Sequence, residues 1–222
     1  MKVPPLKRKS LRDAVIQTIE EALLSGELQP GDRIIEADLA QQAGISRGPV
    51  REAIRQLVGE GVLTSYPSRG TFVTRWTPRA VQEAYSLRAV LEQLAIREAA
   101  QRVTPEEIAQ LQATVDEMDR RAKADDVRAL VRLDVQFHEQ LYALSQHALL
   151  QRMLSQLRRQ LYALMGLDQG FALHRAQIAA DHQAIVDALR AGDAAQAAKA
   201  IATHVLAAGA EVAEQVQGLS HG

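Results

Sequence analysis

Residues 45–55 constrain the fold of this chain most strongly, because one short helix there combines an apolar face with a row of arginines. Ser46 has the side chain of a helix N-cap, whose hydroxyl accepts from a first-turn N–H group, and Pro49 falls where proline is tolerated. The two faces follow helical spacing and consist of Val50, Ile54 and Leu57, and of Arg47, Arg51 and Arg55. A helix of this kind suits the major groove of DNA, although the arginines alone are more typical of a solvated face.

Two helical segments precede this one. The first is expected to begin after an N-cap at Ser10 and to end at Gly26, since apolar residues recur at every fourth position from Leu11 to Leu23. The second is expected over about residues 36–43 and ends at Gly44. A tight glycine-containing turn then separates it from residues 45–55, which is typical of a helix-turn-helix.

A β-hairpin is expected directly after the third helix, which Gly59 and Gly61 interrupt. Residues 62–66 and 71–75 are rich in β-branched and aromatic side chains and flank a turn at residues 67–70. Arg69 lies at the tip of this hairpin, within reach of a groove or a phosphate. Three helices and a two-stranded wing therefore predict a winged helix-turn-helix over residues 1–76.

The same residues resemble the DNA-binding domain of GntR-family bacterial transcription regulators over most of residues 10–75. The resemblance implies operator contacts from the cap residue Ser46, from Arg47 and Arg51, and from the wing glycine Gly70. Ala37 stands where many members have a contacting arginine, so that contact is missing or supplied elsewhere. A basic N-terminal arm either adds phosphate contacts or is a solvated tail; it contains Lys2, Lys7, Arg8, Lys9 and Arg12.

The rest of the chain, residues 77–222, is expected to form an all-α bundle of six helices. The helices are expected over about 78–102, from 105 onward, 125–145, 147–166, 171–191 and 193–218. Thr104, Pro105 and Glu107 form the pattern of a capping box. The chain has no cysteine, no apolar run of about 18 residues and no apolar signal segment, so we expect a cytoplasmic protein without a membrane span or disulfides.

Four polar residues interrupt the apolar faces of three of these helices. Asp134 and His138 lie one turn apart, while His182 and His204 interrupt later helices. A single buried histidine is commonly just hydrogen-bonded to a neighbour, but a buried aspartate needs a partner or a metal. If the four side chains converge, they form a set of three imidazoles and one carboxylate, which suits Zn, Ni, Mn or Fe.

Residues 87–92, 133–138 and 181–185, together with His204, resemble the FadR-type C-terminal ligand-binding (FCD) domain of the same regulators over about residues 78–215. The resemblance implies that Asp134, His138, His182 and His204 hold a divalent metal at the floor of an effector pocket. Arg88 is then either a guanidinium for an effector carboxylate or one half of a surface ion pair with Glu92. The histidines outside the set are His147, His174 and His221.

The function that follows is transcription regulation rather than catalysis. We expect a homodimer that binds a palindromic DNA operator, with an affinity set by a small organic acid bound at the metal and Arg88. Three alternatives remain open at the level of sequence. The metal itself is the signal, the metal is purely structural, or the site is that of a metal-dependent hydrolase.

Overall fold

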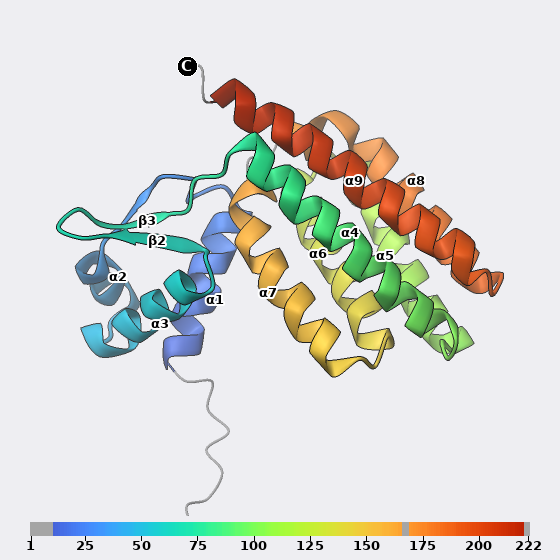
Figure 1. Cartoon of the computed structure of the whole chain (residues 1–222), viewed down its shortest axis with the longest axis horizontal. Helices are drawn as coiled ribbons and strands as arrows, with labels where there is room; N and C mark the ends of the chain where they lie inside the picture. Colours follow the sequence, from blue (N-terminus) through green and yellow to red (C-terminus); the bar gives the residue numbers. More distant parts are fainter. Residues whose placement is uncertain (1–10, 166–168, 220–222) are drawn as a thin grey trace, which may run out of the picture.

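The N-terminal part of the chain folds around the arginine-bearing helix. The computed structural model describes residues 11–165 and 169–219, and the side chains of 169–176 and 219 lie outside this description. The first three helices and three strands are α1 (Leu11–Leu24), β1 (Arg33–Ile34), α2 (Glu36–Ala43), α3 (Arg47–Gly59), β2 (Leu63–Tyr66) and β3 (Gly70–Val73). The helix-turn-helix α2–α3 and the β2–β3 wing confirm the predicted winged helix-turn-helix (Figure 1).

The wing contains one strand more than the sequence predicted. The sheet order is β1-β3-β2, all antiparallel, with Leu63 opposite Val73 and Arg33 opposite Phe72. β1 has only two residues, too few for an alternating pattern to be visible in the sequence. It places Ile34 in the core and turns the Arg33 side chain to solvent.

The N-cap of α3 differs from expectation. Ser46 has the extended backbone of an N-cap residue, but its hydroxyl makes no capping hydrogen bond to the described residues. The usual donor is the N–H group of the second or third helical residue, and the third residue here is Pro49, which has none. The predicted capping bond is therefore wrong, and the exposed hydroxyl lies at the N-terminal end of the helix.

The remaining helices form the expected bundle. They are α4 (Pro78–Ala100), α5 (Pro105–Lys123), α6 (Val127–Leu144), α7 (Ala148–Met165), α8 (Gln169–Arg190) and α9 (Ala194–Leu219). Thr104 and Glu107 form the predicted capping box. Asp126 accepts from the Ala129 N–H group, so α6 begins two residues later than expected. Among the described residues, no helix is both long and apolar enough to cross a membrane.

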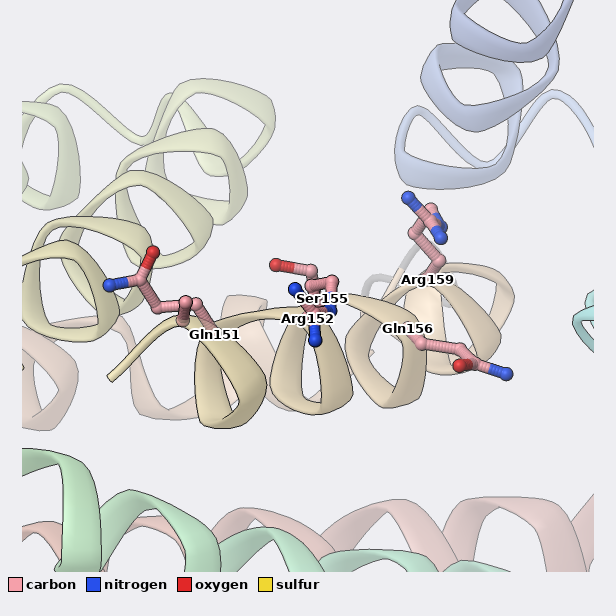
Figure 2. A pocket seen from close by; sticks show the side chains of 6 residues that line it. Gln151, Arg152, Ser155, Gln156 and Arg159 are labelled. Atoms are coloured by element: carbon pink, nitrogen blue, oxygen red, sulfur yellow. The ribbon is translucent and has the colours of Figure 1, made fainter. Parts of the chain in front are cut away.

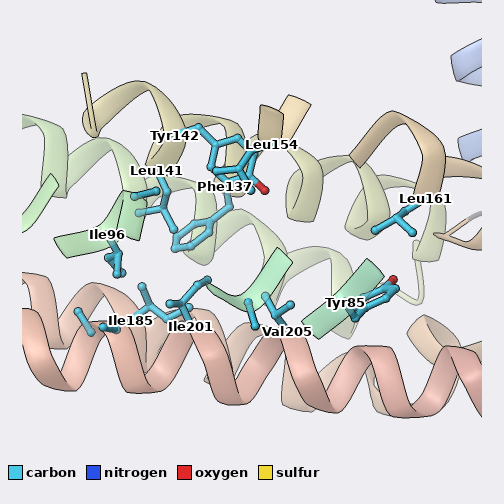
Figure 3. Packing of buried hydrophobic residues seen from close by; sticks show 14 of the residues in the cluster. Tyr85, Ile96, Phe137, Leu141, Tyr142, Leu154, Leu161, Ile185, Ile201 and Val205 are labelled. Atoms are coloured by element: carbon cyan, nitrogen blue, oxygen red, sulfur yellow. The ribbon is translucent and has the colours of Figure 1, made fainter. Parts of the chain in front are cut away.

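The core of the bundle lies between α4, α6, α8 and α9, where α4 packs against both α6 and α9 (Figure 3). Phe137, Leu141 and Ile201 are almost completely buried there. Gly209 lets α9 approach α4 closely, because a Cβ atom at this position would lie 2.5 Å from the Cβ of Tyr85. This close approach fixes the spacing of the two helices that flank the candidate site.

The two parts of the molecule share an apolar cluster. α1 packs against α6 and α7, so Val131, Val135 and Tyr162 lie in the same cluster as Val15 and Ile19. α7 runs between the winged helix-turn-helix and the other helices of the bundle (Figure 1). A movement of α6 or α7 would therefore displace side chains that pack against α1 of the winged helix-turn-helix.

Candidate metal centre and DNA-binding face

Four side chains from three helices meet inside the bundle. Asp134 and His138 come from α6, His182 from α8 and His204 from α9, and one ligand atom of each lies within 4.8 Å of the others. All four residues are buried, His204 least completely at 9% exposure. The amphipathic spacing explains this arrangement, because each residue occupies a core-facing position of its helix.

The histidine Nε2 atoms surround one carboxylate oxygen. Oδ1 of Asp134 lies 3.3 Å from Nε2 of His182 and 3.8 Å from Nε2 of both His138 and His204. Despite these distances, the Nε2 atoms of His138 and His182 have no hydrogen-bond partner among the described residues. Buried nitrogens aimed at a carboxylate without bonding to it fit a divalent cation between them.

The other ring nitrogen of each histidine faces an oxygen atom. Nδ1 of His138 lies 2.7 Å from Glu92 Oε2, and Nδ1 of His182 lies 2.7 Å from the Ile178 carbonyl oxygen. Nδ1 of His204 lies 3.5 Å from Asp181 Oδ2. Such acceptors hold the proton on Nδ1 and leave the Nε2 lone pair for a metal, as outer partners of histidine ligands commonly do.

Burial and mutual charge shift the pKa values of three members of the cluster toward the protonation states of metal ligands. Burial lowers the pKa of His138 to about 4. Burial and the neighbouring His182 also lower the pKa of His204. Burial alone would raise the pKa of Asp134, but the three histidines hold that pKa well below its usual value. Near neutral pH, His138 and His204 therefore present neutral imidazoles and Asp134 presents a carboxylate.

Arg88 is buried beside this cluster and is not part of a surface ion pair. It is 3% exposed, and its Nε donates to Glu92 Oε1 at 2.5 Å. Glu92 also accepts from the Tyr142 hydroxyl at 2.7 Å. The pKa of Glu92 would be raised by burial, but Arg88 and His138 lower it far below its usual value. The Nη2 atom of Arg88 is buried and has no hydrogen-bond partner within the described part of the chain.

Surface pockets among the described residues lie beside several helices of the bundle. One of about 220 Å³ opens between α8 and α9, and its lining includes Asp181, Lys199, Thr203 and His204. Another, of about 560 Å³, follows α7 and includes Arg152, Ser155 and Arg159 (Figure 2). The first pocket reaches His204, a member of the four-residue cluster.

The candidate DNA-contacting residues lie on one end of α3 and on the wing. Ser46, Arg47 and Arg51 are exposed at the N-terminal end of α3, and Arg69 is exposed in the turn between β2 and β3. Arg51 has a partner, since its Nε lies 3.3 Å from Glu36 Oε2. The basic arm at residues 2–9 and the predicted cap Ser10 lie outside the described residues, whereas Arg12 pairs with Asp13.

Gly70 begins β3 with a φ of 109°, a backbone conformation that favours glycine. A Cβ atom there would lie 3.2 Å from Nε of Arg33, so this arginine lies against the start of the wing strand. Arg33 was not among the DNA-contacting residues predicted from the sequence. Arg33 lies on a two-residue strand, which is too short to show a sequence pattern. Its position next to Gly70 could therefore not be predicted.

Three further residues near the cluster had no role predicted from the sequence, namely Tyr142, Asp181 and Arg158. Arg158 was detectable, because it interrupts the apolar face of α7 formed by Leu150, Leu154 and Leu161. The histidines outside the cluster have other surroundings. His147 is exposed and its Nδ1 accepts from the Leu150 N–H group at the start of α7. The side chains of His174 and His221 lie outside the described residues.

Both parts of the chain match families of known proteins. Residues 11–73 match the bacterial regulatory proteins of the gntR family, and residues 83–207 match the FCD domain. The Nta operon transcriptional regulator of Aminobacter aminovorans is 40% identical over 126 residues, which are 56% of this chain and 59% of that regulator. The chain thus spans about three fifths of that relative's length.

Two further similarities extend over most of the chain. An uncharacterized HTH-type transcriptional regulator from an unstable DNA locus of Streptomyces ambofaciens is 30% identical over 201 residues, 90% of this chain and 84% of that protein. The solved structure of Escherichia coli McbR/YncC superposes with a TM-score of 0.77 at 25% identity and covers 95% of this chain and 96% of that one. The similarity therefore includes both the winged helix-turn-helix and the helical bundle.

Proposed function

This chain belongs to the GntR family of bacterial transcriptional regulators with an FCD domain, and we propose that a small carboxylate bound at a divalent metal controls its affinity for an operator. Members of the family bind DNA, and FCD domains bind small-molecule effectors, so the chain is a regulator rather than an enzyme. The observation that carries the proposal is the buried cluster of Asp134, His138, His182 and His204, whose Nε2 atoms at His138 and His182 are unpaired among the described residues.

The donor set indicates which metal ions fit. Three imidazole nitrogens and one carboxylate oxygen suit Zn, Ni, Mn or Fe, and no soft thiolate is present in the chain. When bound, the metal supplies a positive charge and further coordination positions for ligand oxygens. Glu92, the Ile178 carbonyl group and Asp181 orient the three imidazoles toward that position.

A carboxylate effector is favoured by the charge and hydrogen bonding of Arg88. Its Nε is already bound to Glu92, and its Nη2 atom is a buried donor without a partner among the described side chains. A ligand carboxylate would satisfy this donor through a charge-assisted hydrogen bond. Its other oxygen atoms would reach the metal, which selects small acids over neutral molecules of the same size.

The proposed DNA contacts are those of the exposed end of α3 and of the wing. Arg47 and Arg51 approach base edges and phosphates from the N-terminal end of α3, with Ser46 at the same end. Arg69 and Gly70 bring the wing to the neighbouring phosphate backbone or minor groove of the DNA. We assign these contacts to the winged helix-turn-helix of residues 1–76 and the effector site to residues 77–222.

A homodimer is the proposed assembly, located in the cytoplasm. α4 exposes three apolar residues at i, i+3 and i+7 spacing, namely Leu87, Val90 and Leu94, and the neighbouring α9 exposes Leu206. An apolar row of this kind on a solvent-facing helix indicates a surface covered by another chain. A second copy related by a two-fold axis would present two recognition helices to a palindromic operator.

The test is to select a DNA site from random sequences with the full-length protein and to measure its affinity while titrating carboxylic acids. We expect one acid to change the affinity for that DNA, and we expect the change to disappear after chelation and in an Arg88→Gln variant. A response to metal alone, with no acid acting, would favour the metal as the signal. An acid response that survives both chelation and Arg88→Gln would contradict the proposed site.

A further inference from the structure

Three consecutive side chains of α7 connect the metal-binding bundle to the recognition helix. We propose that Arg158, Arg159 and Gln160, here called the coupling segment, transmit the state of the metal site to the C-terminal end of α3. The inference rests on the proposed function and concerns how the state of the metal site changes the winged helix-turn-helix. α7 is suited to this role because it lies between the two parts of the molecule (Figure 1).

Arg158 faces the bundle. It is 3% exposed, its Nη1 donates to the Val135 carbonyl oxygen at 3.2 Å, and its Nη2 donates to the Glu139 carboxylate. Its guanidinium carbon lies 5.6 Å from the ring centroid of Tyr142 and 5.8 Å from that of Tyr162. A buried guanidinium between two aromatic rings is held in one position, because moving it exposes a charge to apolar surroundings.

A short series of buried contacts joins Arg158 to a proposed metal ligand. The Tyr142 ring lies against Arg158, and its hydroxyl donates to Glu92 Oε1 at 2.7 Å. The second oxygen of Glu92 lies 2.7 Å from Nδ1 of His138. These residues are almost fully buried, so a change at His138 Nε2 is not screened by solvent before it reaches Arg158.

Arg159 and Gln160 face the DNA-binding part. Nη2 of Arg159 lies 3.0 Å from Glu60 Oε2, and its Nε lies 3.7 Å from Glu20 Oε1 on α1. Figure 2 shows Arg159 extending from α7 toward the blue ribbon of the N-terminal helices. Nε2 of Gln160 donates to the Glu60 carbonyl oxygen at 2.6 Å. Glu60 is the C-cap residue of α3, so both side chains hold the end of the recognition helix.

The contacts of Arg159 are incomplete, which makes them sensitive to small displacements. Arg159 Nε, Glu20 Oε1 and Glu60 Oε2 are buried and have no hydrogen-bond partner among the described residues. Burial raises the pKa of Glu20 even though Arg159 is nearby. Hydrogen bonds between charged groups weaken steeply as their alignment worsens, and the attraction between the charges falls with distance. Because Arg158 and Arg159 are consecutive residues of α7, a displacement of Arg158 also moves Arg159. It therefore alters the contacts of Arg159 with Glu20 on α1 and with Glu60 at the end of α3.

The experiment measures amide hydrogen exchange of residues 47–60 in the full-length protein, with Zn²⁺ alone as the probe and a chelated sample as reference. Two variants each remove one contact of the series that joins His138 to Glu60. Tyr142→Phe removes the hydroxyl that binds Glu92 and keeps the ring against Arg158. Arg159→Gln removes the charge facing Glu60 and is separated from the metal ligands. Arg152→Gln is the matched control, since Arg152 is exposed on the same helix.

In the unaltered protein and in Arg152→Gln, we expect Zn²⁺ to change the exchange rates of the last turn of α3 by at least fivefold, the lower end of typical coupling factors. In Arg159→Gln, and in Tyr142→Phe, we expect a change below twofold while one Zn²⁺ per chain remains bound. The inference is overturned if Zn²⁺ binds the unaltered protein without changing exchange in α3, or if Arg159→Gln responds fully. Absence of Zn²⁺ binding would instead overturn the proposed function itself.

Discussion

Nε2 of His182 lies 3.3 Å from Oδ1 of Asp134, yet this nitrogen makes no hydrogen bond to any described residue. The two residues come from different helices, α8 and α6, and both face the inside of the bundle. The opposite nitrogen of His182 lies 2.7 Å from the Ile178 carbonyl oxygen, which turns the free lone pair toward Asp134. A cation between the two residues would satisfy both of them.

Replacing Glu92 is expected to destabilise the fold strongly. Glu92→Gln leaves Arg88 as a buried charge without its carboxylate partner, and breaking a buried pair costs about 3–5 kcal/mol. Denaturant unfolding of the chelated protein measures the loss. Glu83→Gln is the control, because Glu83 forms an exposed pair with Arg79 and its loss should cost at most about 0.5 kcal/mol. Equal effects of the two variants would contradict the role of Glu92.

The close approach of α4 and α9 predicts a second stability difference. Gly209→Ala forces a methyl group against Tyr85 and is expected to lower the free energy of unfolding by about 1–3 kcal/mol. Gly218 lies on the same helix, and no described atom would lie within 4 Å of an added Cβ atom. Gly218→Ala is therefore expected to be neutral or stabilising by up to about 1 kcal/mol. A neutral Gly209→Ala would mean that the two helices are farther apart than described.

Arg47 is expected to contribute to operator affinity without supporting the fold. Arg47→Ala removes an exposed side chain at the N-terminal end of α3, and a lost base contact costs about 1–3 kcal/mol of binding free energy. Fluorescence anisotropy with the selected DNA measures this change, and circular dichroism checks the fold. Arg79→Ala on α4 should bind DNA as the unaltered protein does. Unchanged affinity for Arg47→Ala would remove Arg47 from the contact set.

The apolar row on α4 predicts the dimer surface. Val90 is 62% exposed, and Val90→Glu is expected to convert a dimer into monomers because a carboxylate would be buried at the contact. Light scattering after size exclusion gives the mass in solution. Leu149→Glu on α7 is the control, since Leu149 is also exposed. Dissociation by Leu149→Glu alone would place the interface on α7.

Helical periodicity and capping residues were enough to predict the winged helix-turn-helix and the helical bundle. The start of α5 and the end of α8 could be predicted because Thr104 and Gly192 carry local signals, whereas the start of α6 was placed two residues too early. The capping bond of Ser46 was mispredicted because Pro49 removes the donor, and β1 was too short to show a pattern. Capping and periodicity predict an element only when the element is long enough to show a pattern and its neighbours supply the required hydrogen-bond donors.

The candidate site could be predicted only in part. The spacing of Asp134, His138, His182 and His204 placed each one on an apolar face, but convergence depends on how three helices rotate against one another. The burial of Arg88 with Glu92 depends on the packing of α4 under α6 and α9, so i, i+4 spacing alone favoured a surface pair equally well. Contacts between distant segments, such as Gln160 with Glu60, have no local signal.

The metal content of the purified full-length protein, measured after Zn²⁺ or Ni²⁺ loading and desalting and compared with that of two histidine variants, tests the proposed metal centre. We expect one ion per chain in the unaltered protein and in His147→Ala, since His147 is exposed and lies outside the cluster. We expect His182→Ala to lose most of the bound ion while remaining folded. Full metal retention by His182→Ala, or no metal in the unaltered protein, would contradict the proposed metal centre.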